Sequence, residues 1–446
     1  FEVDTQKNRS GLETMGDCAT TDSCIVQDAL LPSSISSLFL SHIQSILLAG
    51  PSVSFLYAFS VWFFNSAWHE SHWLNIESIG CIVLRGAIAI GFYNLSDEIR
   101  GEEDVALAIS CAVLSVLLAM HFTRSTRVKQ VQGVEPAFVS MEGKVVMITG
   151  ANAGIGRETA RQLVQRGATV IMACRSQKRA QEAMDDIRNS LTNAKNKGDM
   201  IFLRLDLSDL QSVRDAAKQF LQMKLPLHIL INNAGLMMGT RTSPPSNSKF
   251  EMMMAANHLG HFLLANLLFS HLTSTASKTK DTARIIHVTS STYHLAGPID
   301  LQDLMADGSN RTHTLFGQYA MTKLANILTT RQLYYQHTSS SFIQSYAVHP
   351  GLVRTEVTKN MPPYLQILNK MFAWVVAIHQ KSPPAGAYTS VFCATAPVDA
   401  LVNGAYYVNS QVQALNKYAL DVDSAKKLWS LSEELVGLKK ASATLY

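Results

Sequence analysis

The feature of this sequence that most constrains its fold is an apolar run that ends in a glycine-rich turn, at residues 145–156. Residues 145–148 have the uninterrupted apolar pattern of a strand buried on both faces, and residues 155–166 continue with apolar residues at helical spacing. Because glycine has no Cβ, the backbone between them can turn sharply and approach a pyrophosphate, which the free N–H groups of a helix start attract. The stretch predicts a strand, a phosphate-binding loop and a helix, with a dinucleotide as ligand. For the loop taken alone, a glycine-rich turn without function is the alternative.

The charged residues of the chain are unevenly distributed. Only 16% of the 446 residues are charged, against about 25% in a typical soluble protein. The deficit lies in four apolar blocks, approximately residues 35–50, 52–68, 79–95 and 105–122. We expect residues 35–129 to be a membrane region with two to four transmembrane or interfacial helices, and residues 1–34 to be a polar, disordered lead-in.

The last of these blocks carries charges of opposite sign on its two sides. Acidic residues precede it between positions 97 and 104, and Arg124, Arg127 and Lys129 follow it. Basic flanks stay on the cytosolic side of a membrane. We therefore expect the rest of the chain to face the cytosol, with the lipid bilayer as a partner.

Charge and cysteine usage argue against two other classes of function. The net charge of +4 is small and dispersed, so nucleic acid is not expected as a partner. The six cysteines have no CxxC spacing, so neither a disulfide framework nor a metal site is indicated.

Strands alternate with helices in the C-terminal two thirds of the chain. Residues 130–142, with Gly133 and Pro136, predict a linker, and residues 143–440 predict one catalytic domain. Expected strands are Val145–Thr149, Thr169–Cys174, Ile201–Asp206, Ile229–Asn232, Arg284–Thr289, Gln344–Val348 and Ala405–Val408. Expected helices are Ile155–Arg166, Gln177–Ser190, Leu210–Met223, Phe250–Leu272 and Gln318–Tyr335. This alternation predicts the α/β class, with a Rossmann-type, doubly wound parallel sheet covered by helices on both faces.

Two further stretches fall where a dinucleotide site needs them. Asn233, Ala234 and Gly235 follow the fourth expected strand, where small residues and an amide can border the adenosine half of a cofactor. Asp206 ends the third expected strand and can hold the adenine amino group. Taken alone, a β-turn for the first and a helix N-cap before Leu210 for the second are equally good readings.

A tyrosine and a lysine lie on one face of an expected helix, at Tyr319 and Lys323. A phenol titrates near pH 10, so it is a poor base at neutral pH unless a nearby cation favours the phenolate. Lys323 can supply that charge and can also reach ribose hydroxyls. Ser290 follows a buried strand at the carboxyl edge of the sheet, where it can bond a substrate oxygen.

Together with these stretches, the chain resembles the short-chain dehydrogenase/reductase family. The motifs that carry the resemblance are Thr149-Gly150-Ala151-Asn152-Ala153-Gly154-Ile155-Gly156, Asn232-Asn233-Ala234-Gly235, Asn257-His258-Leu259-Gly260, Val288-Thr289-Ser290-Ser291, Tyr319-Ala320-Met321-Thr322-Lys323 and His349-Pro350-Gly351. The resemblance covers about residues 142–438. It implies that Tyr319 is the general acid/base, Lys323 lowers its pKa, Ser290 orients the substrate oxygen and Asn257 holds a proton-relay water. Ser291 is the alternative hydroxyl.

The same resemblance extends the expected cofactor site. Val353 and Thr355 would border the nicotinamide. The full set of expected cofactor-binding residues is Gly150, Asn152, Gly154, Ile155, Gly156, Arg175, Asp206, Asn233, Ala234, Gly235, Tyr319, Lys323, Pro350, Gly351, Val353 and Thr355. NADP(H) is the expected cofactor, because Arg175 rather than an acidic residue follows the second strand, and NAD(H) is the alternative.

Within the family, the chain is similar to the retinol dehydrogenase and X-linked dehydrogenase/reductase branch, whose latter member oxidises polyprenol. The segments behind this are Ala173-Cys174-Arg175, Asn257-His258-Leu259-Gly260-His261-Phe262, Lys224-Leu225-Pro226-Leu227-His228-Ile229-Leu230 and Gly404-Ala405-Tyr406-Tyr407-Val408-Asn409. Together with the apolar blocks, the resemblance implies a membrane-anchored oxidoreductase for a lipophilic alcohol or carbonyl of polyprenol, retinoid or steroid type, located in the endoplasmic reticulum membrane.

An apolar segment near residues 360–380 is expected to form a lipid-facing lid over the substrate site. An ordinary core helix is the alternative for that segment. For the whole chain, the alternative is a catalytically silent, dinucleotide-binding membrane scaffold or sensor. The oligomeric state stays open, and a homo-oligomer is compatible with the sequence.

Overall fold

The computed structural model describes residues 133–192, 197–305, 313–337, 342–353 and 380–439. The expected membrane blocks, Thr355 and the expected lid lie outside these residues.

The strand that precedes the glycine-rich loop is buried along its whole length. β1 (Val145–Thr149) alternates its side chains between two hydrophobic layers. Val146 and Ile148 pack into one layer, and Val145 and Met147 pack into the other. Because successive strand residues point to opposite faces, this burial places β1 in the interior of a sheet that is covered on both sides.

Within the described residues, the sheet contains eight strands in the order β3-β2-β1-β4-β5-β6-β7-β8. The remaining strands are β2 (Thr169–Cys174), β3 (Met200–Arg204), β4 (Ile229–Asn232), β5 (Ala283–Val288), β6 (Ile343–His349), β7 (Tyr406–Val408) and β8 (Gln411–Gln413). β1 to β7 run parallel, as the sequence predicted, and β8 adds an antiparallel edge that the sequence did not predict. The strand order reverses between β1 and β4, and ligands of such sheets bind at this switch point.

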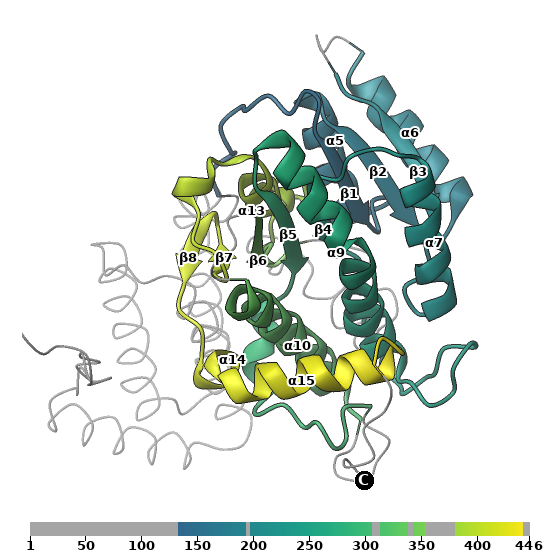
Figure 1. The fold of residues 1–446 in the computed structure, drawn as a ribbon, viewed down its shortest axis with the longest axis vertical. Coiled ribbons are helices and arrows are strands. Elements are labelled where there is room, and N and C mark those ends of the chain that lie inside the picture. The colour runs from purple at the N-terminus through teal and green to yellow at the C-terminus, as the bar shows by residue number, and fades with distance from the viewer. Residues whose placement is uncertain (1–132, 193–196, 306–312, 338–341, 354–379, 440–446) are drawn as a thin grey trace, which may run out of the picture. The chain divides into compact units, whose positions relative to one another are not determined.

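Helices cover both faces of the sheet (Figure 1). One face carries α5 (Gly154–Gln165), α6 (Gln177–Ser190) and α13 (Pro383–Thr395). The other face carries α7 (Leu210–Gln222), α9 (Gly260–Thr279) and α10 (Leu315–Gln336), with α15 (Val422–Leu435) packed against α10. Shorter elements are α8 (Met252–Met254), η1 (Ala255–Leu259), η2 (Ser291–Leu295), η4 (Val398–Ala400) and α14 (Lys417–Leu420). The α/β class and the Rossmann-type arrangement are confirmed.

The helix that was expected to run continuously from Phe250 to Leu272 is interrupted by a π-helical turn. Buried Glu251 caps α8, where its carboxylate accepts hydrogen bonds from the backbone N–H groups of Met253 (2.9 Å) and Met254 (2.8 Å). The π turn η1 follows, and α9 begins at Gly260. A π turn holds one residue more than an α turn, so periodicity alone did not predict it.

One described helical segment, Met252–Thr279, is long and apolar enough to cross a membrane by length and composition. Within the domain, 78% of its apolar window is buried. Its hydrophobicity therefore serves the core between α7, α9 and the sheet.

The segment just before β1 packs onto the end of α5. Arg166 donates a hydrogen bond from Nη2 to the carbonyl of Pro136 (3.1 Å), and its guanidinium carbon lies 5.5 Å from the ring centroid of Phe138. The N–H of Met141 donates to the carbonyl of Arg166 (2.7 Å). The described end of the expected linker is thereby joined to the domain.

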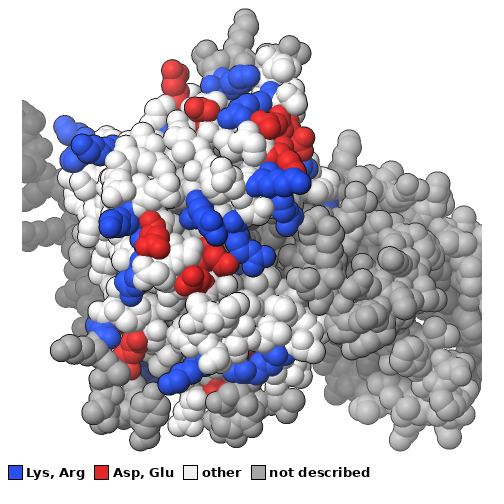
Figure 2. Space-filling view, turned by 90° about the vertical axis from the view of Figure 1, so that its right-hand side faces the viewer, with Lys and Arg blue, Asp and Glu red and all other residues white. Residues whose placement is uncertain are grey.

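On the side of the molecule where α6 and α7 flank the β3 edge of the sheet, basic and acidic side chains are interspersed (Figure 2). Ion pairs such as Arg188–Asp185 (3.0 Å) and Arg157–Asp186 (3.1 Å) lie on this side. Exposed pairs of this kind contribute about 0.5 kcal/mol or less each, so α6 is held mainly by its buried face.

Candidate active site

The glycine-rich loop packs tightly against the loop that follows β4. Gly150 and Gly154 have φ angles of +65° and +54°, which L side chains rarely adopt. A Cβ added to Gly156 would lie 2.4 Å from Asn233 Nδ2 and 2.5 Å from the Gly150 carbonyl oxygen. A Cβ on Gly150 would lie 2.9 Å from that of Ala234. The expected phosphate-binding loop and the expected adenosine-binding loop are therefore in direct contact.

The start of α5 is open to an anion. Its N-cap, Ala153, offers no side-chain hydrogen bond, and the first turn has no acidic residue. The first N–H groups of a helix have no intrahelical partner and attract phosphate. Half-buried Asn152 lies in the loop before this start, and Ile155 follows within its first turn. The glycine cradle and the uncapped helix fit the pyrophosphate of a dinucleotide.

The expected adenosine side of the site lies at the carboxyl ends of β2 and β3. Arg175 is 76% exposed, and its Nη1 lies 3.9 Å from Asp206 Oδ2. The other carboxylate oxygen of Asp206 accepts hydrogen bonds from the N–H (3.0 Å) and the hydroxyl (2.7 Å) of Ser208. Asp209, not Asp206, is the N-cap of α7, so the N-cap alternative for Asp206 was wrong. Oδ2 of Asp206 faces the side where Arg175 lies.

The expected nicotinamide side follows β6. Pro350 and Gly351 form the turn, and Gly351 has a φ of +85°. A Cβ on Gly351 would lie 2.9 Å from Cε of buried Lys381, which pairs with Val353 in an isolated parallel bridge. A Cβ on Gly386 would lie 2.6 Å from a Val353 methyl group and 3.3 Å from Ile155. The structure thus brings Val353 to the side of α5 that carries the phosphate loop.

Asn257 is completely buried in the π turn η1, and its amide clamps the loop after β4. Oδ1 accepts from the N–H of Leu236 (2.8 Å), and Nδ2 donates to the Leu236 carbonyl (2.9 Å). Nδ2 also lies 3.2 Å from Oγ1 of Thr322 on α10. A Cβ on Gly235 would lie 3.3 Å from Lys323 Nζ and 3.7 Å from Asn257 Oδ1, so the glycine leaves room between these groups.

Tyr319 and Lys323 lie one turn apart on α10. Lys323 Nζ is 5.4 Å from the Tyr319 ring centroid and donates a hydrogen bond to the carbonyl of Val288 at the end of β5 (3.0 Å). The hydroxyl of Thr289 donates to the backbone carbonyl of Lys323 (2.9 Å). The carboxyl end of β5 therefore fixes the face of α10 that carries the tyrosine and the lysine.

Lys323 is buried and Tyr319 is half-buried, and desolvation disfavours the charged form of each. Desolvation raises the pKa of Tyr319 to about 12 and lowers the pKa of Lys323 to about 8. The lowering of the Tyr319 pKa that was expected from Lys323 is not seen in this structure. At neutral pH Tyr319 is a phenol, which is the form that donates a proton.

Ser290 lies two residues after the end of β5, in extended conformation, and is the N-cap of η2. Its Oγ accepts a 3.3 Å hydrogen bond from the N–H of Thr292. Ser291 begins η2, and its N–H donates to Nδ1 of His349 (3.3 Å). Because η2 packs against α10, the structure places both serines near the helix that carries Tyr319.

Comparison with known proteins identifies the family. Residues 144–299 match the short chain dehydrogenase family. Retinol dehydrogenase 14 of Homo sapiens is 36% identical over 353 residues, which cover 75% of this chain and 100% of that protein. The chain belongs to the short-chain dehydrogenase family. Retinol dehydrogenase 12 of Mus musculus is 39% identical over 69% of this short-chain dehydrogenase and 90% of its own length.

The fold of this short-chain dehydrogenase has a solved counterpart. A protein from Mycobacterium Paratuberculosis matches with a TM-score of 0.53 and 30% identity, over 68% of this chain and 98% of that one. Membership in the family, with the retinol dehydrogenases as relatives, makes the chain an oxidoreductase that acts on CH–OH groups with NAD(P).

Two residues that sequence reasoning did not place in the site of this short-chain dehydrogenase join its parts. The hydroxyl of Thr149, at the end of β1, accepts hydrogen bonds from the N–H groups of Asn233 and Ala234, both 2.9 Å. The ring of His261 lies 2.8 Å from that hydroxyl and 3.0 Å from the carbonyl of Asn257. A usable signal existed for His261, because a polar residue four positions after Asn257 lies on the same helix face.

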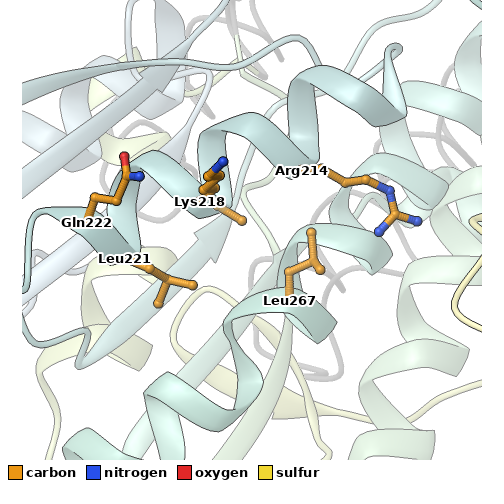
Figure 3. Close-up of a pocket in the computed structure, with 6 residues that line it drawn as sticks. Arg214, Lys218, Leu221, Gln222 and Leu267 are labelled. Carbon is orange, nitrogen blue, oxygen red and sulfur yellow. The ribbon is translucent and has the colours of Figure 1, made fainter.

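A surface hollow of about 360 Å³ lies between α7 and α9, away from these residues (Figure 3). It is lined by Arg214, Ala217, Lys218, Leu221, Gln222 and Leu267. None of the expected site residues of this short-chain dehydrogenase borders the hollow, so we assign it no part in the chemistry.

Proposed function

We propose that this chain is a membrane-anchored, NADP(H)-dependent oxidoreductase that interconverts a lipophilic alcohol and its carbonyl, with a retinoid, polyprenol or steroid as the substrate class. The observation that carries the proposal is the convergence of Asn257, Ser290, Tyr319 and Lys323 at one edge of the sheet, beside the glycine cradle. The names of the retinol dehydrogenase relatives favour an isoprenoid alcohol within that class.

In the proposed reaction, the bound dinucleotide supplies or accepts the hydride. Tyr319 donates a proton to the carbonyl oxygen during reduction and takes it back during oxidation, and Ser290 holds that oxygen by its hydroxyl. During reduction, the raised pKa of Tyr319, about 12, keeps the proton on the phenol until the carbonyl oxygen arrives. The Lys323 ammonium stabilises the tyrosinate left after transfer, and Asn257 holds the water through which the proton is replaced.

The cofactor is held by the two loops that meet at the switch point. Gly150, Gly154 and Gly156 leave space for the pyrophosphate at the start of α5, and Asn233 and Ala234 border the adenosine half. Pro350, Gly351, Val353 and Thr355 would border the nicotinamide. Exposed Arg175 would pair with a 2′-phosphate, which favours NADP(H) over NAD(H).

The membrane proposal rests on the sequence. The apolar block at residues 105–122 and the basic residues after it support an anchor with the catalytic domain on the cytosolic side, in the endoplasmic reticulum membrane. The apolar segment near residues 360–380 would then admit the substrate from the lipid surface. A silent dinucleotide-binding scaffold is less well supported, because binding alone needs neither Ser290 nor the buried Lys323.

Changing Tyr319→Phe tests the chemistry. We expect kcat with NADPH to fall by at least about 100-fold for all-trans-retinal, a polyprenal and a steroid ketone, because positioned acid–base catalysis contributes a factor of this order. The dissociation constant of NADPH, measured by fluorescence titration, should change less than about twofold. Tyr334→Phe makes the same substitution at the far end of α10 and serves as the matched control. Turnover by Tyr319→Phe at the level of this control would refute the assigned mechanism.

A further inference from the structure

A network of buried hydrogen bonds connects the loop after β4, which packs against the phosphate loop, to the turn that carries Asn257. It begins at the backbone N–H groups of Asn233 and Ala234, which donate to Thr149 Oγ1. Oγ1 lies 2.8 Å from His261 Nε2, and His261 Nδ1 lies 3.0 Å from the carbonyl oxygen of Asn257. Thr149, His261 and Asn257 are 0%, 1% and 0% exposed, so water does not compete for these bonds.

The donors and acceptors of this hydrogen-bond network determine where each of its protons lies. The Asn257 carbonyl only accepts, so the imidazole proton is on Nδ1 of His261. Burial lowers the pKa of His261 to about 3, so the ring is neutral and Nε2 offers a lone pair. The Thr149 hydroxyl already accepts two N–H groups, and its own proton therefore points to Nε2. Each donor meets one acceptor, and each acceptor at least one donor.

The two ends of this hydrogen-bond network belong to different parts of the proposed site. At one end, Asn233 and Ala234 lie against Gly156 and Gly150 of the phosphate loop. At the other end, Asn257 lies in the π turn and clamps Leu236 with its side-chain amide. His261 bonds to Thr149, which holds the first end, and to the Asn257 carbonyl at the second end.

We propose that His261 is a positioning residue that couples the dinucleotide-binding loops to the Asn257 turn. The effect on catalysis at the Asn257 end rests on the proposed function. The effect on dinucleotide binding at the other end does not. Imidazole suits the role because its two nitrogens accept on one side and donate on the other. A side chain without both groups leaves the Thr149 proton and the Asn257 carbonyl without partners in a dry interior.

The main test replaces His261→Phe in the full-length chain in mild detergent. We expect the NADPH dissociation constant to rise and kcat for all-trans-retinal at saturating NADPH to fall, each by at least about tenfold, because unpaired buried polar groups cost this much. Amide exchange at residues 233–236, read by mass spectrometry, should accelerate. The matched control is His258→Phe, since His258 is also 1% exposed in η1 but bonds to Ser432 of α15. His258→Phe should change neither the NADPH dissociation constant nor kcat by more than about twofold.

If His261→Phe does not fold, Thr149→Val and Thr149→Ser keep the proposal testable. Valine retains the shape and removes the hydroxyl, whereas serine retains the hydroxyl. We expect Thr149→Val to lower kcat at saturating NADPH, an effect that reaches Asn257 through His261, and we expect Thr149→Ser to restore it. When both His261→Phe and Thr149→Val fold, their effects on kcat should be non-additive in a double-mutant cycle.

The outcomes separate the two proposals. A wild-type protein that binds NADPH but turns over no aldehyde, ketone or alcohol refutes the proposed function, while the NADPH constants and amide exchange still test the coupling. The coupling is refuted if His261→Phe and His258→Phe have the same NADPH constant and kcat. It is also refuted if Thr149→Val weakens NADPH binding but leaves kcat unchanged.

Discussion

Replacing Lys323→Met should make the domain more stable at neutral pH while removing its activity. Lys323 is 2% exposed, and burial lowers its pKa from 10.5 to about 8. At about 1.4 kcal/mol per pKa unit, the buried ammonium costs about 3 kcal/mol of folding free energy when it is charged. Methionine has a similar volume and no charge. It also loses the hydrogen bond to Val288, worth about 1 kcal/mol, so we expect a net gain of about 2 kcal/mol.

The pH dependence of this gain has a defined sign. Below about pH 8 the lysine is protonated in both the folded and the unfolded chain, so the full cost is present. Between about pH 8 and 10.5 the folded chain releases its proton while the unfolded chain keeps it, and the cost shrinks. The stability advantage of Lys323→Met should therefore be largest at pH 7 and should disappear near pH 10.5.

The assay is equilibrium urea unfolding without dinucleotide, followed by far-ultraviolet circular dichroism at pH 7, 9 and 10.5. Lys218→Met, at an exposed lysine on α7, is the control and should change the unfolding free energy by less than about 0.5 kcal/mol. A Lys323→Met protein that is less stable than the wild type at pH 7 would refute the reasoning. An advantage that is equal at all three pH values would refute it as well, because its origin would then not be the charge.

Two further substitutions address the cofactor site. Gly156→Ala places a Cβ 2.4 Å from Asn233 Nδ2 and 2.5 Å from the Gly150 carbonyl oxygen. We expect NADPH affinity to fall by at least about tenfold. Unchanged affinity in a titration would contradict the assignment of this loop to the pyrophosphate. Arg175→Ala should weaken NADPH by about 5- to 20-fold, the loss of one charge-assisted contact to phosphate, and leave NADH within about twofold; equal losses for both cofactors would show that Arg175 does not read the 2′-phosphate.

The sequence predicted the parallel sheet well because a buried parallel strand has a strong local signature. β1, β2 and β4 were placed with their observed bounds, since each is an apolar run that ends at small or polar residues. β8 was not predicted, because its residues are Gln-Val-Gln, with one apolar side chain in three positions, and its pairing is set by β7.

For the expected active-site residues too, the sequence predicted what is local and missed what depends on the folded structure. The residue types and their order along the chain marked Tyr319, Lys323, Asn257 and the glycine loop. Sequence alone did not reveal that burial would raise the pKa of Tyr319 rather than allow Lys323 to lower it, since this depends on how much water the folded domain excludes. His261 was also missed, because its role follows from a contact with Thr149, which is 112 positions away in the chain.

The π turn at Ala255–Leu259 sets a strict condition on chain length. Each residue of an α-helix turns the following ones by about 100°, so deleting one residue in this turn would rotate either Asn257 or the whole of α9 by that angle. The result would be a regular helix with better local geometry and a misdirected amide. In this part of the domain a chain shorter by one residue could be as well folded as the natural one and still be unable to assemble its site. Insertions and deletions between Glu251 and Gly260 should therefore be far less compatible with activity than substitutions there.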